Sequence, residues 1–477
     1  MNTRLETTSR AGPLPAQRID AAGHAHVDQR AVLALALPLM ANAAIQIILN
    51  LTDMWFIGHI STAALAGVAA VQWLVLVAVL ILGGVASAVQ TIAAQSFGAR
   101  RYVRASQAVW IALWATLGAT PLFVAAGASG HLMLAPFGLK PEIELLATSF
   151  WFPRVGGAAF GVAAWGMLGF FNAIGRPRIT LLITVATTLA NVLFNDVFIF
   201  HLGWGVAGSG WATTVAQALG LLLCIVIFVQ PPYRQKFKSH LTWKLHWPQL
   251  REQLKLGLPS GLLPAADLLG TSIFQMMQVR LGTVDGAATQ MAMMLTSVAY
   301  MPGFGIAQAG TTLVGQSIGA GNRDWGMRLG SRIIVMAALY MGGIGVLLAI
   351  AGPVLLPLFA QAGDAEALSA VALGEQLLWL AAIYQAFDGL NMGSSLCLRG
   401  AGDVVVPAAL VIPVSWIIFV PLAHSLTFTP EQGWVRFLPQ FGYGAIGGWA
   451  ALVVYVMLLG TTMCLRWRSG AWQRIKL

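Results

Sequence analysis

The sequence predicts an all-α polytopic membrane protein in which twelve transmembrane helices form two six-helix lobes. Of its 477 residues, 58% are hydrophobic and 9% are charged, whereas about a quarter of the residues in soluble domains are charged. Apolar runs of about 20 residues, long enough to cross a bilayer, recur along most of the chain. Short motifs also repeat in the same order in the two halves. These observations leave no room for a sizeable soluble domain.

The apolar runs, separated by short polar connections, predict the positions of twelve spans. We expect them at residues 31–57, 63–90, 106–128, 145–170, 179–200, 206–229, 253–279, 288–314, 330–352, 368–396, 404–424 and 442–465. The first six spans would form an N-terminal lobe, residues 31–229, and the last six a C-terminal lobe, residues 253–465.

Three polar segments lie outside the predicted spans. Residues 1–30 contain no apolar segment typical of a signal peptide, so we expect a disordered cytoplasmic tail. Residues 230–252 form a basic linker between the lobes, which we expect to lie on the lipid headgroups of the cytoplasmic face. Residues 466–477 form a basic cytoplasmic tail.

The net charge of +10 arises from basic residues that gather on one side of the predicted membrane. All but four of the 27 Lys and Arg residues lie in the tails or in connections that follow even-numbered spans; the exceptions are Lys140, Arg154, Arg280 and Arg436. By the positive-inside rule, both termini of this multi-pass protein face the cytoplasm. The topology explains the charge, and nucleic acid is not expected as a partner.

Three motif pairs indicate an internal repeat. They are AQSFGA at 94–99 with GQSIGA at 315–320, NAIGRPR at 172–178 with RGAGDVV at 399–405, and GVAGSGWA at 205–212 with GAIGGWA at 444–450, at offsets of 221, 227 and 239 residues. Because each half has an even number of spans, the halves run in the same direction and are related by a pseudo-twofold axis along the membrane normal. Transporters built this way bind substrate and ions between their lobes, near the midplane, and alternate access by rocking.

Four spans carry polar residues three or four positions apart, which places each set on one helix face. The sets are Asn42, Gln46, Asn50 and Asp53; Thr184, Thr188, Asn191 and Asn195; Asp267, Thr271, Gln275 and Gln278; and Tyr384, Asp388, Asn391 and Ser395. Asp196 is turned away from its neighbours. The amides and hydroxyls can be ordinary interhelical hydrogen-bond partners. A carboxylate within a span is unfavourable by roughly 2.5–3.5 kcal/mol on insertion scales, and it indicates a functional site.

Asp53, Asp267 and Asp388 are therefore the candidates for cation coupling. Apolar surroundings disfavour a charged carboxylate until a cation or water reaches it. Binding of H⁺ or Na⁺ neutralises such a site, and an organic cation that competes for the same oxygens displaces the ion. Hard oxygen ligands favour Na⁺, whereas a lone carboxylate with amide partners favours a proton.

The neighbouring polar residues complete the predicted sites. We expect Asn191 and Asn195 near Asp53, and Tyr384 near Asp388, where together with Asp267 it offers an oxygen cage for Na⁺. The residues expected to line the substrate cavity are Asn42, Gln46, Asn50, Thr271, Gln275, Gln278, Met294 and Asn391. No other cofactor and no fixed metal is expected.

The sequence resembles the multidrug and toxic-compound extrusion (MATE) family over about residues 30–465. The motifs that carry the resemblance are LALPLM followed by DMWFIGH, the AQSFGA and GQSIGA loops, NVLFND with GWGVAGSGWAT, GLPSGLLPAAD, and AAIYQAFD with LCLRGAGD. The chain is most similar to the bacterial NorM-like branch, with some DinF-like features. The resemblance implies two six-helix lobes in a bacterial inner (plasma) membrane and export of drug-like organic cations in exchange for H⁺ or Na⁺.

The resemblance also implies roles for individual residues. Asp53 matches the coupling acid of the N-terminal lobe, with Asn191 and Asn195 as its neighbours, and Asp388 with Tyr384 matches the cation site of the C-terminal lobe. Three positions depart from the family's pattern. Asp267 stands eight residues after Pro259, where the sodium-coupled branch has glutamate, Met294 stands where asparagine is often found, and Asn195 stands where the proton-coupled archaeal-type branch has aspartate.

Other classes of protein fit the sequence less well. An enzyme would need a catalytic constellation, but the histidines are scattered at span ends and in loops, and the three cysteines have no metal-ligand spacing. A flippase for lipid-linked precursors, from the same superfamily, is the main alternative. It would need cationic side chains for phosphates, whereas the inward charges here are acidic. A channel would have no need of carboxylates in both lobes. We expect a monomer whose partners are the lipid bilayer and small organic cations.

Overall fold

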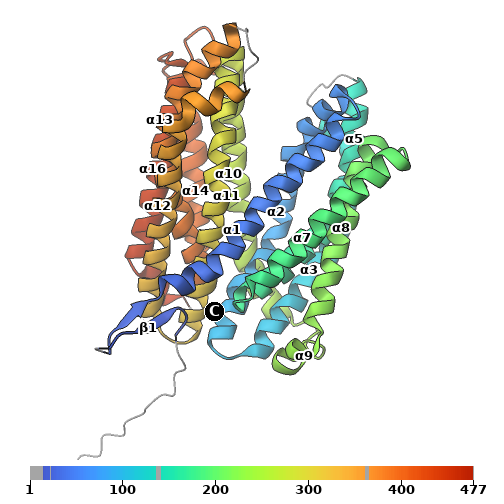
Figure 1. The fold of residues 1–477 in the computed structure, drawn as a ribbon, viewed down its shortest axis with the longest axis vertical. Helices are drawn as coiled ribbons and strands as arrows, with labels where there is room; N and C mark the ends of the chain where they lie inside the picture. Colours follow the sequence, from blue (N-terminus) through green and yellow to red (C-terminus); the bar gives the residue numbers. More distant parts are fainter. Residues whose placement is uncertain (1–13, 22, 136–140, 360–364, 476–477) are drawn as a thin grey trace, which may run out of the picture.

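The computed structural model describes residues 14–21, 23–135, 141–359 and 365–475, and this part of the chain is almost entirely helical (Figure 1). Six long helical segments precede the linker: α1 (Gln29–Gly58), α2 (Thr62–Gly98), α3 (Tyr102–Ala128), α5 and α6 (Pro141–Gly156 and Ala158–Ala173), α7 (Pro177–Asp196, extended by a π-helical turn at Val197–His201) and α8 (Gly205–Phe228). Two short helices, α4 (Gly130–Leu134) and α9 (Pro231–Phe237), lie in connections.

Six further segments follow the linker. They are α10 (Trp247–Leu281), α11 (Thr283–Gly319), α12 (Arg323–Leu355, followed by a 3-10 turn at Leu356–Phe359), α13 (Ala365–Ala401), α14 and α15 (Val405–Pro413 and Val420–Thr427, joined by a π-helical turn at Val414–Phe419) and α16 (Gly444–Arg468). Each of the twelve predicted spans therefore coincides with a helical segment.

By length and composition, eight described helices could cross a membrane, or up to ten if each of two bent pairs counts as one span. One bent pair is α2, which bends by 46° between Ile81 and Gly83, and the other is α5 with α6, which bend by 42°. Helices α10 and α11 are as long but less apolar, because Gly, Ser, Thr and Gln interrupt their sequences. Helices suit this environment because they satisfy every backbone polar group internally.

Capping residues explain where several helices begin. Asp28 accepts hydrogen bonds from the backbone N–H groups of Arg30 and Ala31 at the start of α1. Ser61 accepts from the N–H of Ala64 at the start of α2. These side chains satisfy N–H groups that a helix leaves without a partner in its first turn.

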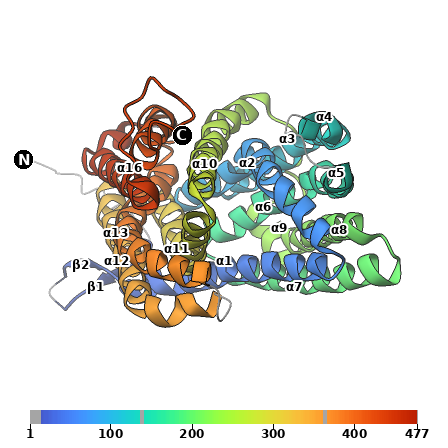
Figure 2. The same cartoon turned by 90° about the horizontal axis from the view of Figure 1, so that it is seen from above.

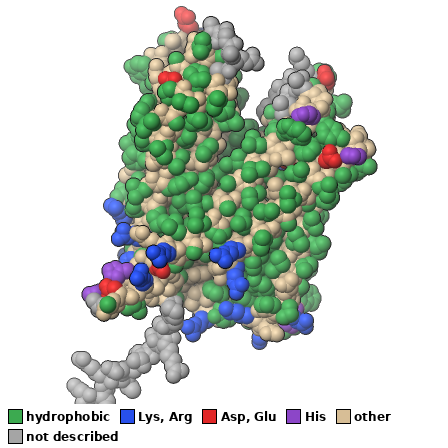
Figure 3. Space-filling model, viewed as in Figure 1, with side chains coloured by type: hydrophobic (Ala, Val, Ile, Leu, Met, Phe, Trp, Pro, Cys, Tyr) green, Lys and Arg blue, Asp and Glu red, His purple; other side chains and the backbone are tan. Residues whose placement is uncertain are grey.

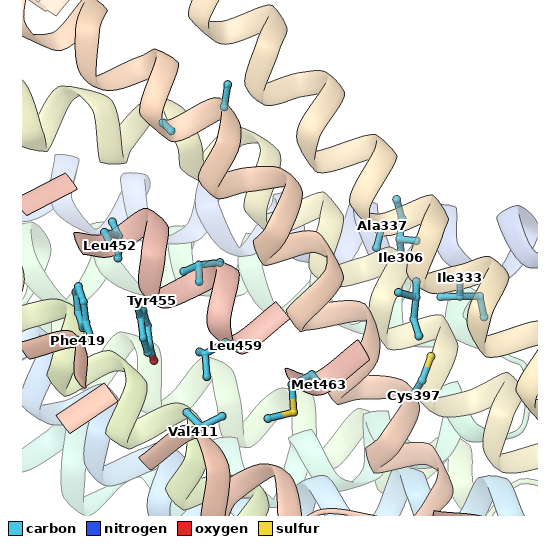
Figure 4. Close-up of a cluster of buried hydrophobic side chains, with 14 of the residues drawn as sticks. Ile306, Ile333, Ala337, Cys397, Val411, Phe419, Leu452, Tyr455, Leu459 and Met463 are labelled. Carbon is cyan, nitrogen blue, oxygen red and sulfur yellow. The ribbon is translucent and has the colours of Figure 1, made fainter. Parts of the chain in front are cut away.

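Two groups of helices stand side by side, α1 to α8 on one side and α10 to α16 on the other (Figures 1 and 2). We call them the N-terminal and C-terminal lobes. The start of α1 crosses the boundary, because Val32, Leu35 and Leu39 pack into the hydrophobic core of the C-terminal lobe. Figure 4 shows part of this core, including Tyr455 beside Phe419.

The two ends of the molecule differ in charge. Lys and Arg side chains gather at the end that carries α9 and the α2–α3 and α11–α12 connections, which we call the basic end (Figure 3). The lobes contact each other toward this end and diverge toward the opposite end, where the space-filling view shows a notch between them.

The prediction that residues 1–30 are a disordered tail is wrong for most of the segment that the structure describes. Two short antiparallel strands form a hairpin there: β1 (Gln17–Ile19) and β2 (Ala25–Val27). The indole N–H of Trp325, on α12, donates to the backbone carbonyl of Pro15 over 2.9 Å. A docking surface on the C-terminal lobe thus orders a sequence that could not form a core by itself. Residues 1–13 and 22 lie outside the described part.

The linker and the C-terminal tail also pack against the lobes. Trp110 of α3 donates from its indole N–H to the carbonyl of Ser239 over 2.7 Å, which ties the linker to the N-terminal lobe. In the predicted tail 466–477, a 3-10 turn at Ala471–Arg474 follows α16. The ring of Trp472 in this turn is buried and stacks on Trp467, with 4.7 Å between ring centroids.

Candidate ion and substrate sites

Two of the predicted acids, Asp267 on α10 and Asp388 on α13, line the same cavity of about 240 Å³. Three other predicted residues line it as well: Thr271, Tyr384 and Asn391. Helices α10, α11, α13, α14 and α16 supply most of the wall, and α2 and α6 of the N-terminal lobe add Leu80 and Trp165. The structure thus brings together acids that are more than a hundred residues apart in the chain.

Asp267 is held by a tyrosine that the sequence analysis did not identify. The hydroxyl of Tyr455, on α16, donates to Oδ1 of Asp267 over 2.5 Å. The ring of Tyr455 stacks on Phe419 with 4.5 Å between centroids, and this contact fixes its position. The polar side chains nearest to Tyr455 along α16 are Thr461 and Thr462, six and seven residues away, so no stripe at three- or four-residue spacing marked it.

Asp388 is more buried than Asp267, and one of its carboxylate oxygens has no hydrogen-bond partner among the described residues. Its side chain is only 6% exposed, and Oδ2 has no hydrogen-bond partner in the described structure. Asn391 and Tyr384 flank it on α13, and Asp267 is close enough to act on it electrostatically. No Lys, Arg or His lies within 4 Å of either carboxylate in the part of the chain that the structure describes. Two acids without a basic partner therefore face one apolar cavity.

The same cavity extends toward the basic end, where it meets Arg399 and Asp403. Asp403 is paired, because Nε of Arg466 donates to its Oδ2 over 2.8 Å. Arg399 forms no ion pair among the described residues, and its Nε is buried without a hydrogen-bond partner. The cavity wall thus contains two unpaired acids and one unpaired cation.

A second acidic site lies in the N-terminal lobe. Asn195 of α7 donates from Nδ2 to Oδ1 of Asp53 over 2.7 Å and to Oδ1 of Asn191 over 2.9 Å. Asn191 in turn donates to the hydroxyl of Thr213, on α8, over 3.1 Å. Arg154 acts on Asp53 electrostatically but forms no ion pair with it within 4 Å. The expected neighbours are therefore in place, and Thr213 joins them.

Several residues predicted to line the substrate cavity lie elsewhere. Those absent from its lining are Asn42, Gln46, Asn50, Gln275, Gln278 and Met294. Gln46 and Asn50 are exposed on α1, and Met294 is 45% exposed on α11.

Gln278 shows why a shared helix face is not sufficient to place a residue in the cavity. It follows Asp267 by eleven residues, which returns it to nearly the same face but about 16 Å further along the helix axis. There it packs against Gly448 of α16, and both its side-chain polar atoms are buried without a partner in the described structure. Height along the helix, as well as direction, decides which residues reach the cavity.

The repeated motifs meet where the lobes contact each other at the basic end. Gln95, in AQSFGA, donates from Nε2 to the carbonyl of Gly400 in the opposite lobe over 2.9 Å. Gln316, in GQSIGA, donates to the carbonyl of Ala173 over 2.7 Å. The two bonds are related by the internal repeat, and each spans the boundary between the lobes.

A second related pair of hydrogen bonds lies one helical turn away. The hydroxyl of Thr91 donates to the carbonyl of Arg399 over 3.0 Å, and that of Thr312 donates to the carbonyl of Asn172 over 3.3 Å. All four bonds connect a side chain of α2 or α11 to the backbone of the opposite lobe. These four hydrogen bonds join the two lobes at the basic end.

Two helical lobes, with a carboxylate held between helices in each, are the build of a membrane transport protein. The MatE family model matches residues 38–197 and 264–424, once in each lobe. The chain therefore belongs to the MATE family, and it is a bacterial membrane protein of a transporter family. The repeated match agrees with the internal repeat of the sequence.

Curated relatives and solved structures agree with this assignment. The chain is 27% identical over 454 residues to the probable multidrug resistance protein NorM of Mesorhizobium japonicum, covering 92% of this chain and 93% of that protein. It is 24% identical over 459 residues to the protein of the same name from Thermotoga maritima, covering 94% and 93%. A multidrug resistance MATE family transporter of the MOP superfamily, solved in an outward-facing conformation, has a TM-score of 0.78 and 19% identity, with 93% and 96% coverage.

Proposed function

We propose that the protein is a secondary active antiporter that exports amphipathic organic cations in exchange for H⁺ or Na⁺. The observation that carries this proposal is the pair of acids, Asp267 and Asp388, that face one apolar cavity without a basic partner. A carboxylate in such surroundings is stabilised by whichever cation reaches it. Competition between an ion and an organic cation for these oxygens then produces exchange.

The two acidic sites favour different ions. The C-terminal site offers oxygens from two carboxylates, Asn391, Tyr384 and Tyr455, and hard oxygen ligands suit Na⁺. The N-terminal site offers one carboxylate with Asn191 and Asn195 as amide partners, an arrangement that suits a proton. We therefore assign coupling to both lobes.

The arrangement of the lobes supports transport by alternating access. By the positive-inside rule, the basic end faces the cytoplasm, and both termini lie on that side. The notch between the lobes would then open to the outside (Figure 3). Rocking of the lobes about their contact would open the cavity alternately to either side. The relatives named as multidrug resistance proteins support organic cations as the cargo.

A flippase for lipid-linked precursors would require the opposite charge in the cavity. Phosphate groups are bound by arginine and lysine side chains. Arg399 is the unpaired cation in the described cavity wall, and it is outnumbered by Asp267 and Asp388. The balance of charge favours a cationic substrate.

The proposal is tested by efflux of a cationic dye from vesicles that contain the purified protein. A proton gradient is imposed first and a sodium gradient second, each without the other. We expect one or both to drive transport against the dye gradient. Efflux that needs neither ion, or that equally transports an anionic dye of similar size, would contradict it.

Removal of the charge of Asp53 is expected to abolish proton release when substrate is added. In detergent without sodium, the wild-type protein should release protons as the organic cation displaces them from acids. The Asp53→Asn variant lacks the titrating group but keeps a side chain that can bond to Asn195. A pH-indicator signal equal to that of the wild type would remove Asp53 from the mechanism.

Loss of the hydroxyl of Tyr455 is expected to raise the Na⁺ concentration needed for half-maximal efflux, because the hydroxyl holds Oδ1 of Asp267 in place and offers one of the oxygens of the proposed Na⁺ site. Interactions with charged groups contribute about 1.5–3 kcal/mol, which corresponds to about a 10-fold or larger shift. Ion titration of efflux by Tyr455→Phe measures this shift. Tyr443→Phe is the matched control, since Tyr443 is 64% exposed and lies outside the cavity. An unchanged ion requirement in Tyr455→Phe would contradict this role.

A further inference from the structure

A second cavity, of about 310 Å³, lies between the lobes at the basic end. The N-terminal lobe contributes Arg101 and Arg104 to its wall, and the C-terminal lobe contributes Arg323. Gln95 and Ser96 add polar groups, and no acidic side chain is among the described residues that line it. The cavity is separate from the transport cavity and has the opposite charge.

The arginines that line this cavity have hydrogen-bonding capacity to spare. Arg104 donates from Nη2 to Oε1 of Glu252 over 2.6 Å, and Arg323 donates from Nη2 to the carbonyl of Ile475 over 3.3 Å. The side chain of Arg101 makes no hydrogen bond or ion pair within the described structure. Because each guanidinium has five N–H donors, most of the donors around the cavity remain available.

Comparison of the two repeats shows that the turn leading into Arg101 is locally unfavourable. AQSFGA is followed by Arg100 and Arg101, whereas GQSIGA is followed by Gly321 and Asn322. Both first positions have a left-handed backbone, with φ of +58° at Arg100 and +82° at Gly321, which glycine adopts easily and arginine does not.

At the next position, the second repeat has a residue that suits the start of a helix, and the first repeat does not. Asn322 caps α12 by accepting a hydrogen bond from the N–H of Trp325 over 2.8 Å. Arg101 occupies the same position before α3 and provides no side-chain cap. The first repeat thus has a cavity-lining arginine, Arg101, where the second repeat has a helix-capping asparagine. A departure of this kind from local preference indicates a functional site.

We propose that this cavity binds an anion of the phosphate class, held by Arg101 and Arg104 from one lobe and Arg323 from the other. Planar guanidinium groups bind phosphate oxygens in pairs, and they suit phosphate monoesters and diesters. The anion is either the headgroup of an anionic phospholipid or a soluble phosphate. Since the arginines come from both lobes, it binds best while the basic end is closed and favours that conformation.

The test uses the full-length protein in detergent and follows its thermal unfolding midpoint. Inorganic phosphate is titrated at constant ionic strength, and short-chain phosphatidylglycerol is titrated against phosphatidylcholine. We expect a saturable rise in the midpoint. Saturation by inorganic phosphate identifies a soluble anion as the ligand, and saturation by phosphatidylglycerol alone identifies a lipid headgroup.

Variants that copy residues of the second repeat into the first separate the site from general surface charge. Arg101→Asn removes a cavity arginine and should lower the affinity at least about tenfold, since hydrogen bonds to charged groups contribute strongly. Arg100→Gly removes the same charge one residue away, at a position outside the cavity lining, and should leave the affinity unchanged. Equal losses in both variants, or no saturable binding of either ligand, would overturn the proposal.

Glu252→Gln is expected to change the affinity for the anion in the opposite direction to Arg101→Asn. It removes the carboxylate that occupies Arg104 and should raise the affinity for the anion. A fall in affinity in this variant would also overturn the proposal, because it would mean that Glu252 does not compete with the ligand for Arg104.

Discussion

Replacement of Asp388 by asparagine is expected to abolish ion-driven efflux while the protein remains in the membrane at its usual level. The amide has nearly the same shape as the carboxyl group but cannot carry the charge that attracts a coupling ion. Because Asp388 is buried and its Oδ2 has no partner among the described residues, little packing is lost. We expect the rate to fall about 100-fold, the upper range for loss of a charged hydrogen-bonding group.

Dye efflux from vesicles, corrected for the amount of protein, measures this effect. Asp196→Asn is the matched control, because it makes the same chemical change at the end of α7, outside the cavity, on a side chain that is 49% exposed. The control should transport at the wild-type rate. Efflux by Asp388→Asn at that same rate would end the assignment of coupling to the C-terminal cavity.

Methyl groups at Gly98 and Gly319 are expected to force the lobes apart at the basic end. A Cβ at Gly98 would collide with the carbonyl oxygen of Gln316, and a Cβ at Gly319 with that of Gln95. Both obstacles are backbone atoms, so relief requires separation of α2 from α11. Overpacking of this kind costs about 1–3 kcal/mol, which shifts a conformational equilibrium about 5- to 160-fold.

The Gly98→Ala, Gly319→Ala double variant should therefore favour the state that is open at the basic end, and its efflux should fall. Distances between spin labels on α2 and α11 would report the separation. Gly343→Ala is the matched control: it adds a methyl group to α12 where nothing lies within 4 Å, and it favours the helix. An unchanged label distance in the double variant would show that this contact does not control opening.

The polar residues that recur three or four positions apart in the sequence predicted part of the acidic site in each lobe. Asp53 with Asn191 and Asn195, and Asp388 with Tyr384 and Asn391, lie on single helix faces or in adjacent helices, and periodicity identifies such sets. Their roles in coupling stay predictions until transport is measured.

Other members of the sites were missed. Tyr455 has no polar residue three or four positions away on α16, so no stripe marked it, whereas Thr213 belongs to a stripe with Ser209 and Gln217 on α8 that was not singled out. Gln278 had the pattern but lies about 16 Å further along α10 than Asp267, outside the cavity lining. The terminal hairpin was missed because a surface far away in the chain, around Trp325, orders it.

The sequence by itself determined the helices, the repeat and the side on which the basic residues lie, because apolar length, motif order and charge are properties of the chain alone. Only the tertiary structure decided that Asp267 and Asp388 share a cavity, that the glutamines of the two repeats reach across to the opposite lobe, and that three arginines converge at the basic end. These features depend on distances between helices, and the packing of two lobes sets those distances.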